Sequence, residues 1–177
     1  MPRILPIAIF AALVLPGAVL PGAALAAPAP GDDPSPYLQA FRDTCLTAFP
    51  DFDTIARKAT EQGWQDSKLT VRGDPKDLPM SLPRAFRKDG MMLFLTTIDS
   101  GPLQRVCQIA GTAATKLRGA DVAEVVSPVL GGAAPEPVRS RREDAALWTT
   151  APGISVQAGI AIYGRMRTLT FSVRQQR

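Results

Sequence analysis

The last third of the chain alternates apolar and polar residues with the period of two that is typical of a half-buried strand. Residues 154–162 follow this alternation without a break, and residues 168–173 repeat it. Turn residues at 152–153 and 164 separate these runs from each other and from a further strand expected at residues 145–150. The pattern predicts a three-stranded antiparallel meander with one buried face.

A second group of strands is predicted in the middle of the chain. Residues 91–98 are strongly apolar, which favours a strand that is buried on both faces. The Asp-Gly pair at residues 89–90 is a favoured two-residue hairpin turn, so residues 84–88 are expected to lead into that strand. Residues 103–109 follow a Gly-Pro turn and are expected to form the returning strand.

Three segments show the three-and-four spacing of amphipathic helices. Residues 37–49 carry one apolar stripe, and residues 52–62 carry another behind a favourable N-cap, Asp51. Residues 121–130 begin like a capping box but contain Pro128, which predicts a short or kinked helix. Residues 65–83 are polar and proline-rich, and we expect a long loop there, with a possible short strand near residues 69–72.

The order of these elements is two helices, three strands, one helix and three strands. It predicts an α+β domain in which helices cover one face of an antiparallel sheet of about five to six strands. A run of strands, then a helix, then three strands is similar in topology to the PAS or profilin-like order. Such a likeness concerns the fold and implies no function.

The N-terminus has the three parts of a secretory signal peptide. Arg3 is followed by an apolar run to residue 25, and Ala24–Leu25–Ala26 supplies small residues before a cut near residue 26. The alternative, a membrane-spanning helix, needs about 20 continuous apolar residues, and prolines at positions 6, 16 and 21 interrupt this run. We therefore expect Sec-type export to the periplasm or beyond, a disordered Pro-rich leader over residues 27–36, and one α+β domain over residues 37–177.

The chain has two cysteines, Cys45 and Cys107. An even number of cysteines in an exported protein favours a disulfide. Two buried free thiols are the alternative. A redox pair is less favoured, because the spacing does not match Cys-x-x-Cys.

The chain contains no histidine. This excludes Ser-His-Asp and Cys-His catalysis and removes the commonest metal ligand. No phosphate-binding glycine loop or nucleophile-elbow motif is found either. The remaining acids to test are the pairs Asp51 and Asp53, and Asp74 and Asp77. We assign no catalytic residue and expect neither a metal nor a cofactor.

Three short motifs resemble the start of small exported proteobacterial proteins of unknown function. They are Phe41-Arg-Asp-Thr-Cys45, Phe49-Pro-Asp-Phe52 and Ala59 followed by Gly63-Trp64. In that family a second cysteine lies on a later strand, where Cys107 stands here. The resemblance implies an envelope location and a disulfide, and no catalytic activity.

These observations favour a non-catalytic envelope protein that binds a small apolar ligand or a partner protein. Apolar residues that could line a ligand cup are Met91, Met92, Phe94 and Trp148, although apolar strand residues are more often core. The alternative is an inhibitor or immunity-type interaction module. A carboxylate-dependent enzyme is less favoured.

The formal net charge of the chain is +4, a mild excess that does not suggest nucleic acid as a partner. After cleavage we expect no integral membrane segment. The arginines of the C-terminal part could form a patch for anionic lipid or polysaccharide, since basic clusters attract anions at long range. Those arginines are Arg139, Arg141, Arg142, Arg165, Arg167 and Arg174. A solvated strand face would also account for them.

Overall fold

The computed structural model describes residues 33–69, 83–99 and 101–176. The expected signal peptide, most of the expected leader and the pair Asp74 and Asp77 lie outside these ranges. Helices α1 (Ser35–Phe41), α2 (Phe52–Glu61) and α3 (Gly119–Val129) pack beside one large sheet. Its strands are β1 (Gln65–Ser67), β2 (Arg84–Lys88), β3 (Met91–Thr97), β4 (Leu103–Thr112), β5 (Glu136–Ser140), β6 (Glu143–Ala151), β7 (Ile154–Tyr163) and β8 (Met166–Gln176).

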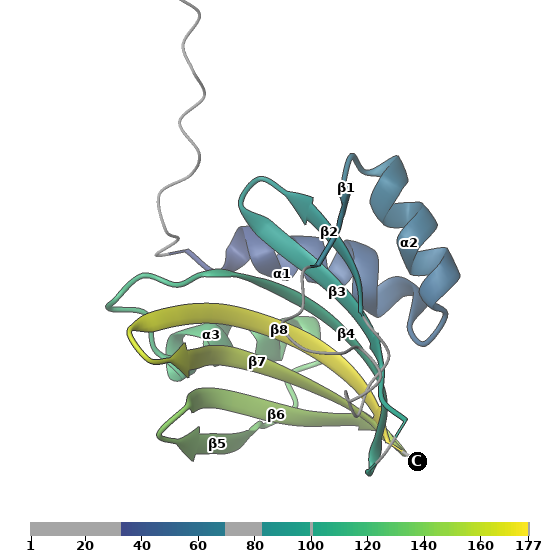
Figure 1. The fold of residues 1–177 in the computed structure, drawn as a ribbon. Coiled ribbons are helices and arrows are strands. Elements are labelled where there is room, and N and C mark those ends of the chain that lie inside the picture. The colour runs from purple at the N-terminus through teal and green to yellow at the C-terminus, as the bar shows by residue number, and fades with distance from the viewer. Residues whose placement is uncertain (1–32, 70–82, 100, 177) are drawn as a thin grey trace, which may run out of the picture.

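The sheet joins two meanders through their last strands. Its order is β1-β2-β3-β4-β8-β7-β6-β5, and every neighbouring pair is antiparallel. Each meander follows a helical segment, so the chain repeats one plan of helix and four strands (Figure 1). The α+β class with an antiparallel sheet is as expected. The result is a larger sheet than the PAS or profilin-like order implied.

The expected number of five to six strands is wrong, because the sheet has eight. The two missed strands, β1 and β5, lie at the two edges. β1 is a run of three polar residues, and β5 contains Pro137 in a largely exposed segment. An edge strand buries little surface and tolerates proline, so it carries no strong alternation in the sequence.

The helices cover one face of the sheet. α1 contacts β4 and β8, while α3 contacts β6 and β7. The Phe41 ring lies 5.9 Å from the Phe171 ring of β8, and both side chains are fully buried. The alternation on β7 and β8 sends Val156, Ile160 and Leu169 into this core. Burial of these apolar side chains is the main source of stability for such a layer.

Local signals set the helix ends. The Asp51 carboxylate accepts hydrogen bonds from the backbone N–H groups of Asp53 and Thr54, which confirms the predicted N-cap. At the other end of α2, Gly63 has a φ of +84°, and the Trp64 N–H donates to the Ala59 carbonyl.

The first helix differs from the prediction over residues 37–49. It begins at Ser35, within the expected leader, and it changes at Arg42–Leu46 into a π-helical turn, η1. The expected disulfide is present: Cys45 of η1 is bonded to Cys107 of β4, and both residues are fully buried.

Candidate binding face

The second face of the sheet carries no helix in the described part of the chain, and we call it the open face. Pairing places Gln108 of β4, Ser172 of β8 and Gln157 of β7 side by side in one row. The residues that follow Gln108 and Gln157, namely Ile109 and Ala158, belong to the core. Because side chains alternate along a strand, Gln108, Ser172 and Gln157 point to the open face.

The centre of the open face is polar and tightly enclosed. Ser155, Gln157 and Ser172 are only 6%, 6% and 2% exposed. The Ser172 hydroxyl donates to the Gln157 backbone carbonyl, and the Gln157 amide donates to the Glu143 carboxylate. Buried polar groups of this kind are normally hydrogen-bonded, and here the partners lie on neighbouring strands.

Arg174 is the cation closest to the polar centre of this face, whereas Arg87 lies at its β2 edge beside Met92. It lies between Val106 and Ser155 in the next row, is half-buried, and donates from Nε to the Ser172 hydroxyl over 3.1 Å. Burial lowers the pKa of Arg174, and the negative charge of Glu143 opposes that shift. Among the described residues no carboxylate forms a salt bridge with it. Its two terminal nitrogens have no hydrogen-bond partner among the residues that the structure describes.

The four predicted ligand-lining residues are not brought together. Met92 and Phe94 share the open face, because their neighbour Leu93 is fully buried in the core. Met91 packs against the core, and Trp148 is 1% exposed within it. The Trp148 indole N–H donates to the Ala133 carbonyl, so its role is structural.

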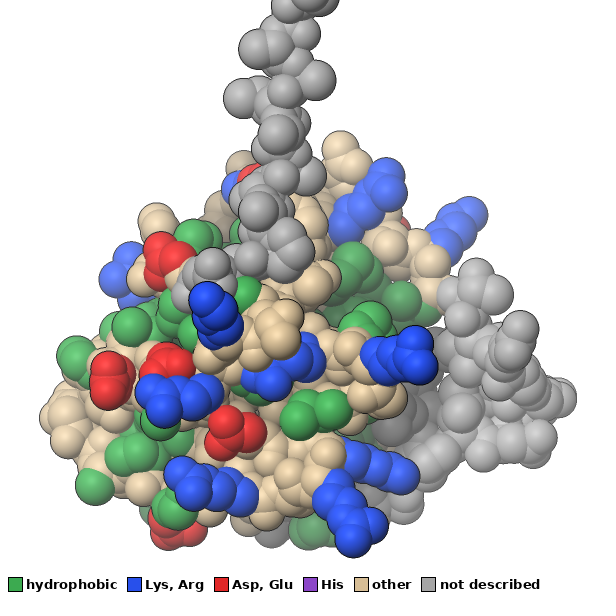
Figure 2. Space-filling model, turned by 90° about the vertical axis from the view of Figure 1, so that its left-hand side faces the viewer, with side chains coloured by type: hydrophobic (Ala, Val, Ile, Leu, Met, Phe, Trp, Pro, Cys, Tyr) green, Lys and Arg blue, Asp and Glu red, His purple; other side chains and the backbone are tan. Residues whose placement is uncertain are grey.

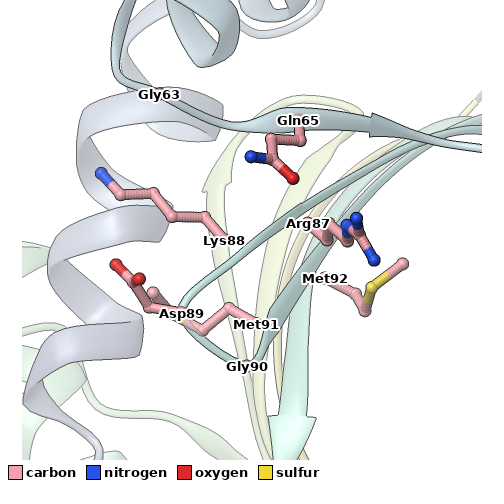
Figure 3. A pocket seen from close by; sticks show the side chains of 8 residues that line it. All are labelled: Gly63, Gln65, Arg87, Lys88, Asp89, Gly90, Met91 and Met92. Atoms are coloured by element: carbon pink, nitrogen blue, oxygen red, sulfur yellow. The ribbon is translucent and has the colours of Figure 1, made fainter. Parts of the chain in front are cut away.

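A pocket of about 330 Å³ lies at the turn between β2 and β3 (Figure 3). Arg87 and Met92 point to one side of the hairpin in Figure 3, and Lys88 and Asp89 point to the other. The Lys88 ammonium donates to the Gln62 carbonyl. The lining residues are Gly63, Gln65, Arg87, Lys88, Asp89, Gly90, Met91 and Met92. Three of them are charged, so this pocket does not form the apolar cup that the two methionines suggested.

The predicted arginine patch does not form one cluster. Arg141 and Arg142 lie in the β5–β6 turn and Arg165 lies in the β7–β8 turn, all exposed. Arg167 faces the helix side and donates to the Leu117 carbonyl, while its Nε is buried without a partner. Arg139 is exposed on β5, in the lining of a groove beside α3. Sequence alternation could have separated Arg167 from Arg174, because an odd spacing along one strand places side chains on opposite faces.

The described acid pair serves the fold. Asp51 caps α2, and its pKa is lowered chiefly by the hydrogen bonds from Thr54. Asp53 forms a salt bridge of 2.8 Å with Arg84. Across residues 33–69, 83–99 and 101–176, no group of three potential metal ligands is found. None of the helices in these ranges is both long and apolar enough to cross a membrane.

Comparison with known proteins gives no match at any level. No family model matches the chain, no curated protein matches it, and no solved structure matches it.

Proposed function

We propose that this protein is an exported, non-catalytic binding protein of the cell envelope that holds a small amphipathic anion on its open face. The observation that carries the proposal is Arg174. A half-buried guanidinium loses hydration, and this loss is offset only when an anion or several acceptors replace the water. Only one of its donors has a protein partner among the described residues.

The residues near Arg174 can contact both the charged group and the apolar part of such a ligand. The hydroxyl of Ser155 lies beside the guanidinium and can add a hydrogen bond to a carboxylate or phosphate. The Ser172 hydroxyl, which already donates to the Gln157 carbonyl, accepts from Arg174 and holds the guanidinium in place. Val106, Phe94 and Met92 lie on the β3–β4 side of the same face and can contact an apolar tail. We expect the charged group of the ligand near β8 and its apolar part near β3.

Two features support a non-catalytic role. The chain has no histidine, and both members of its described acid pair already have structural partners. Export is supported by the expected signal peptide and agrees with the disulfide, which persists in oxidising compartments.

Native mass spectrometry of protein purified from the periplasm tests the proposal first. We expect extra mass that disappears on denaturation, and we expect the denatured chain to begin near residue 27. Decanoate and uncharged decanol then serve as probes in calorimetric titration. Decanoate should bind, and the variant Arg174→Gln should bind it at least tenfold more weakly, the loss of one charge-assisted hydrogen bond.

The matched control is Arg139→Gln, which removes the same charge from an exposed position on β5. It should leave decanoate binding unchanged. The proposal would be contradicted if decanol bound as tightly as decanoate. It would also be contradicted if the protein carried no copurified mass and bound neither probe. A stoichiometric protein in the native spectrum would favour the alternative, an interaction module.

A further inference from the structure

The charges of this protein are separated along the direction of its strands. One end of the sheet, which we call the hairpin end, comprises residues 87–90, 112–119, 139–144 and 162–168. These segments hold nine Lys and Arg against three Asp and Glu. The remaining described residues hold seven Lys and Arg against ten Asp and Glu. A nearly balanced chain therefore has one strongly basic end.

Figure 2 looks onto this end of the molecule. Basic side chains lie across the whole view, while most acidic ones lie in its left half. The arginines of the two neighbouring turns belong to this surface. Arg141, Arg142 and Arg165 are exposed, and none of them forms a salt bridge with any described residue.

The same end carries an unusual apolar pair. Tyr163 and Met166 are 61% and 60% exposed, and they face each other across the β7–β8 turn. Tyr163 lies two positions after Ala161 on β7, and Met166 lies two positions before Thr168 on β8. Both side chains therefore point to the open face, as those of Ala161 and Thr168 do. Among the large apolar residues of the described chain only Val129 is also markedly exposed. Two such side chains at the tip of one hairpin mark a contact surface.

The two turns form one continuous surface. The Ile162 N–H donates to the Arg142 carbonyl over 2.8 Å, which holds the β5–β6 turn beside the β7–β8 hairpin. Arg141, Arg142, Ile162, Tyr163 and Gly164 line a shared hollow of about 480 Å³. Cations and an aromatic ring are thus held side by side on strand ends.

We propose that the hairpin end docks on a bilayer rich in anionic phospholipid, with Arg141, Arg142 and Arg165 at the phosphate level and Tyr163 and Met166 in the interface. This inference goes beyond the proposed ligand and does not depend on it. The occupant follows from the chemistry of the tip. A soluble polyanion would need only the charges, whereas an exposed tyrosine and methionine between arginines match the apolar and anionic layers of a membrane surface.

Cosedimentation of the mature protein with vesicles tests the inference. The vesicles contain phosphatidylcholine alone or phosphatidylcholine and phosphatidylglycerol in equal parts. We expect binding only to the anionic vesicles and weaker binding at higher salt, because salt screens exposed charges. Each arginine near the surface contributes about fivefold, so Arg141→Gln/Arg142→Gln/Arg165→Gln should lose about a hundredfold in affinity.

A matched variant controls for net charge. Arg42→Gln/Arg57→Gln/Lys68→Gln removes three exposed cations outside the hairpin end and should bind as the parent does. Tyr163→Ser/Met166→Ser keeps every charge and should weaken binding about tenfold or more. All of these side chains are exposed, and an unchanged melting temperature would show that each variant folds.

Three results would overturn the inference. The first is no binding of the parent to anionic vesicles at low salt. The second is an equal loss in the control triple variant, which would mean that net charge alone acts. The third is unchanged vesicle binding by Tyr163→Ser/Met166→Ser together with equally tight binding of the parent to dextran sulfate, which would identify a general polyanion site.

Discussion

Two arginines on the same strand have different surroundings. Arg174 lies on the open face beside Ser172, whereas Arg167 lies on the helix side beneath the chain segment before α3. Their spacing of seven positions is odd, so alternation alone places them on opposite faces. Both residues are cations by type. Only the direction of each side chain shows that Arg174 is a candidate ligand contact and that Arg167 has a structural role.

Asp51 gives a prediction about pH at the residue scale. Its pKa in the folded protein is lowered from 3.8, first by the Thr54 hydrogen bonds. A depressed folded pKa means that the carboxylate stabilises the fold above the unfolded pKa and that this contribution disappears as the pH falls through the folded value. Asp51→Asn keeps a capping oxygen that does not titrate.

We therefore expect the melting temperature of the parent protein to decrease relative to that of Asp51→Asn as the pH falls below about 4. The measurement is thermal unfolding of both proteins in a series of buffers from neutral to strongly acidic pH. A constant difference across the series would show that the ionised state of Asp51 has no part in capping α2.

At the scale of the element, the strands differ in how clearly their own sequences predict them. β7 and β8 alternate apolar and polar residues because each sends one face into the core. β7 was predicted with nearly its observed bounds, whereas only the central residues 168–173 of β8 were predicted. β1 and β5 bury almost no side-chain surface, and they are strands because they pair with β2 and β6. A strand that is defined by its neighbour cannot be recognised from its own residues.

Two strand glycines give a paired prediction. A Cβ on Gly159 of β7 would overlap the backbone of Ala145 on β6, whereas the three atoms nearest to a Cβ on Gly111 of β4 all belong to the side chain of Tyr37. Backbone cannot move without disturbing the pairing of β6 and β7, while the half-buried Tyr37 ring can turn aside. Gly159→Ala should therefore cost about 3 kcal/mol in free energy of unfolding, and Gly111→Ala about 1 kcal/mol or less.

Urea unfolding of the two variants beside the parent checks this difference. Equal losses in free energy of unfolding would mean that the backbone of β6 adjusts to the added methyl group as easily as the side chain of Tyr37 does.

At the scale of the whole molecule, the disulfide connects the helical layer to the centre of the sheet. Cys45 belongs to η1 and Cys107 to β4, and 62 positions separate them in sequence. On the chain-entropy model, closing a loop of this length restricts the unfolded chain and stabilises the protein by about 4 kcal/mol.

Cys45→Ala/Cys107→Ala should accordingly unfold at a lower urea concentration than the oxidised parent, and the reduced parent should resemble the variant. The measurement is a urea titration followed by tryptophan fluorescence, since Trp64 and Trp148 are both buried. Coincident curves for the oxidised and reduced parent would show that the bridge adds no stability.

Charge separation is a second property of the whole molecule. The excess of cations at the hairpin end comes from four segments that lie far apart in the chain. In the sequence they are a scatter of arginines and lysines within a mild overall excess. Antiparallel pairing brings their turns to one end, and only there do the charges reinforce one another.

By itself the sequence determined the α+β class, the N-cap of α2, the meander of β6, β7 and β8, and the pairing of its two cysteines. These features depend on periodicity, on turn chemistry or on an even cysteine count, all of which are local or countable. Only the tertiary structure decided the eight-strand order, the position of Trp148 in the core and the residues that surround Arg174. Those outcomes depend on register between distant strands, and a register is set by the packing of the whole sheet.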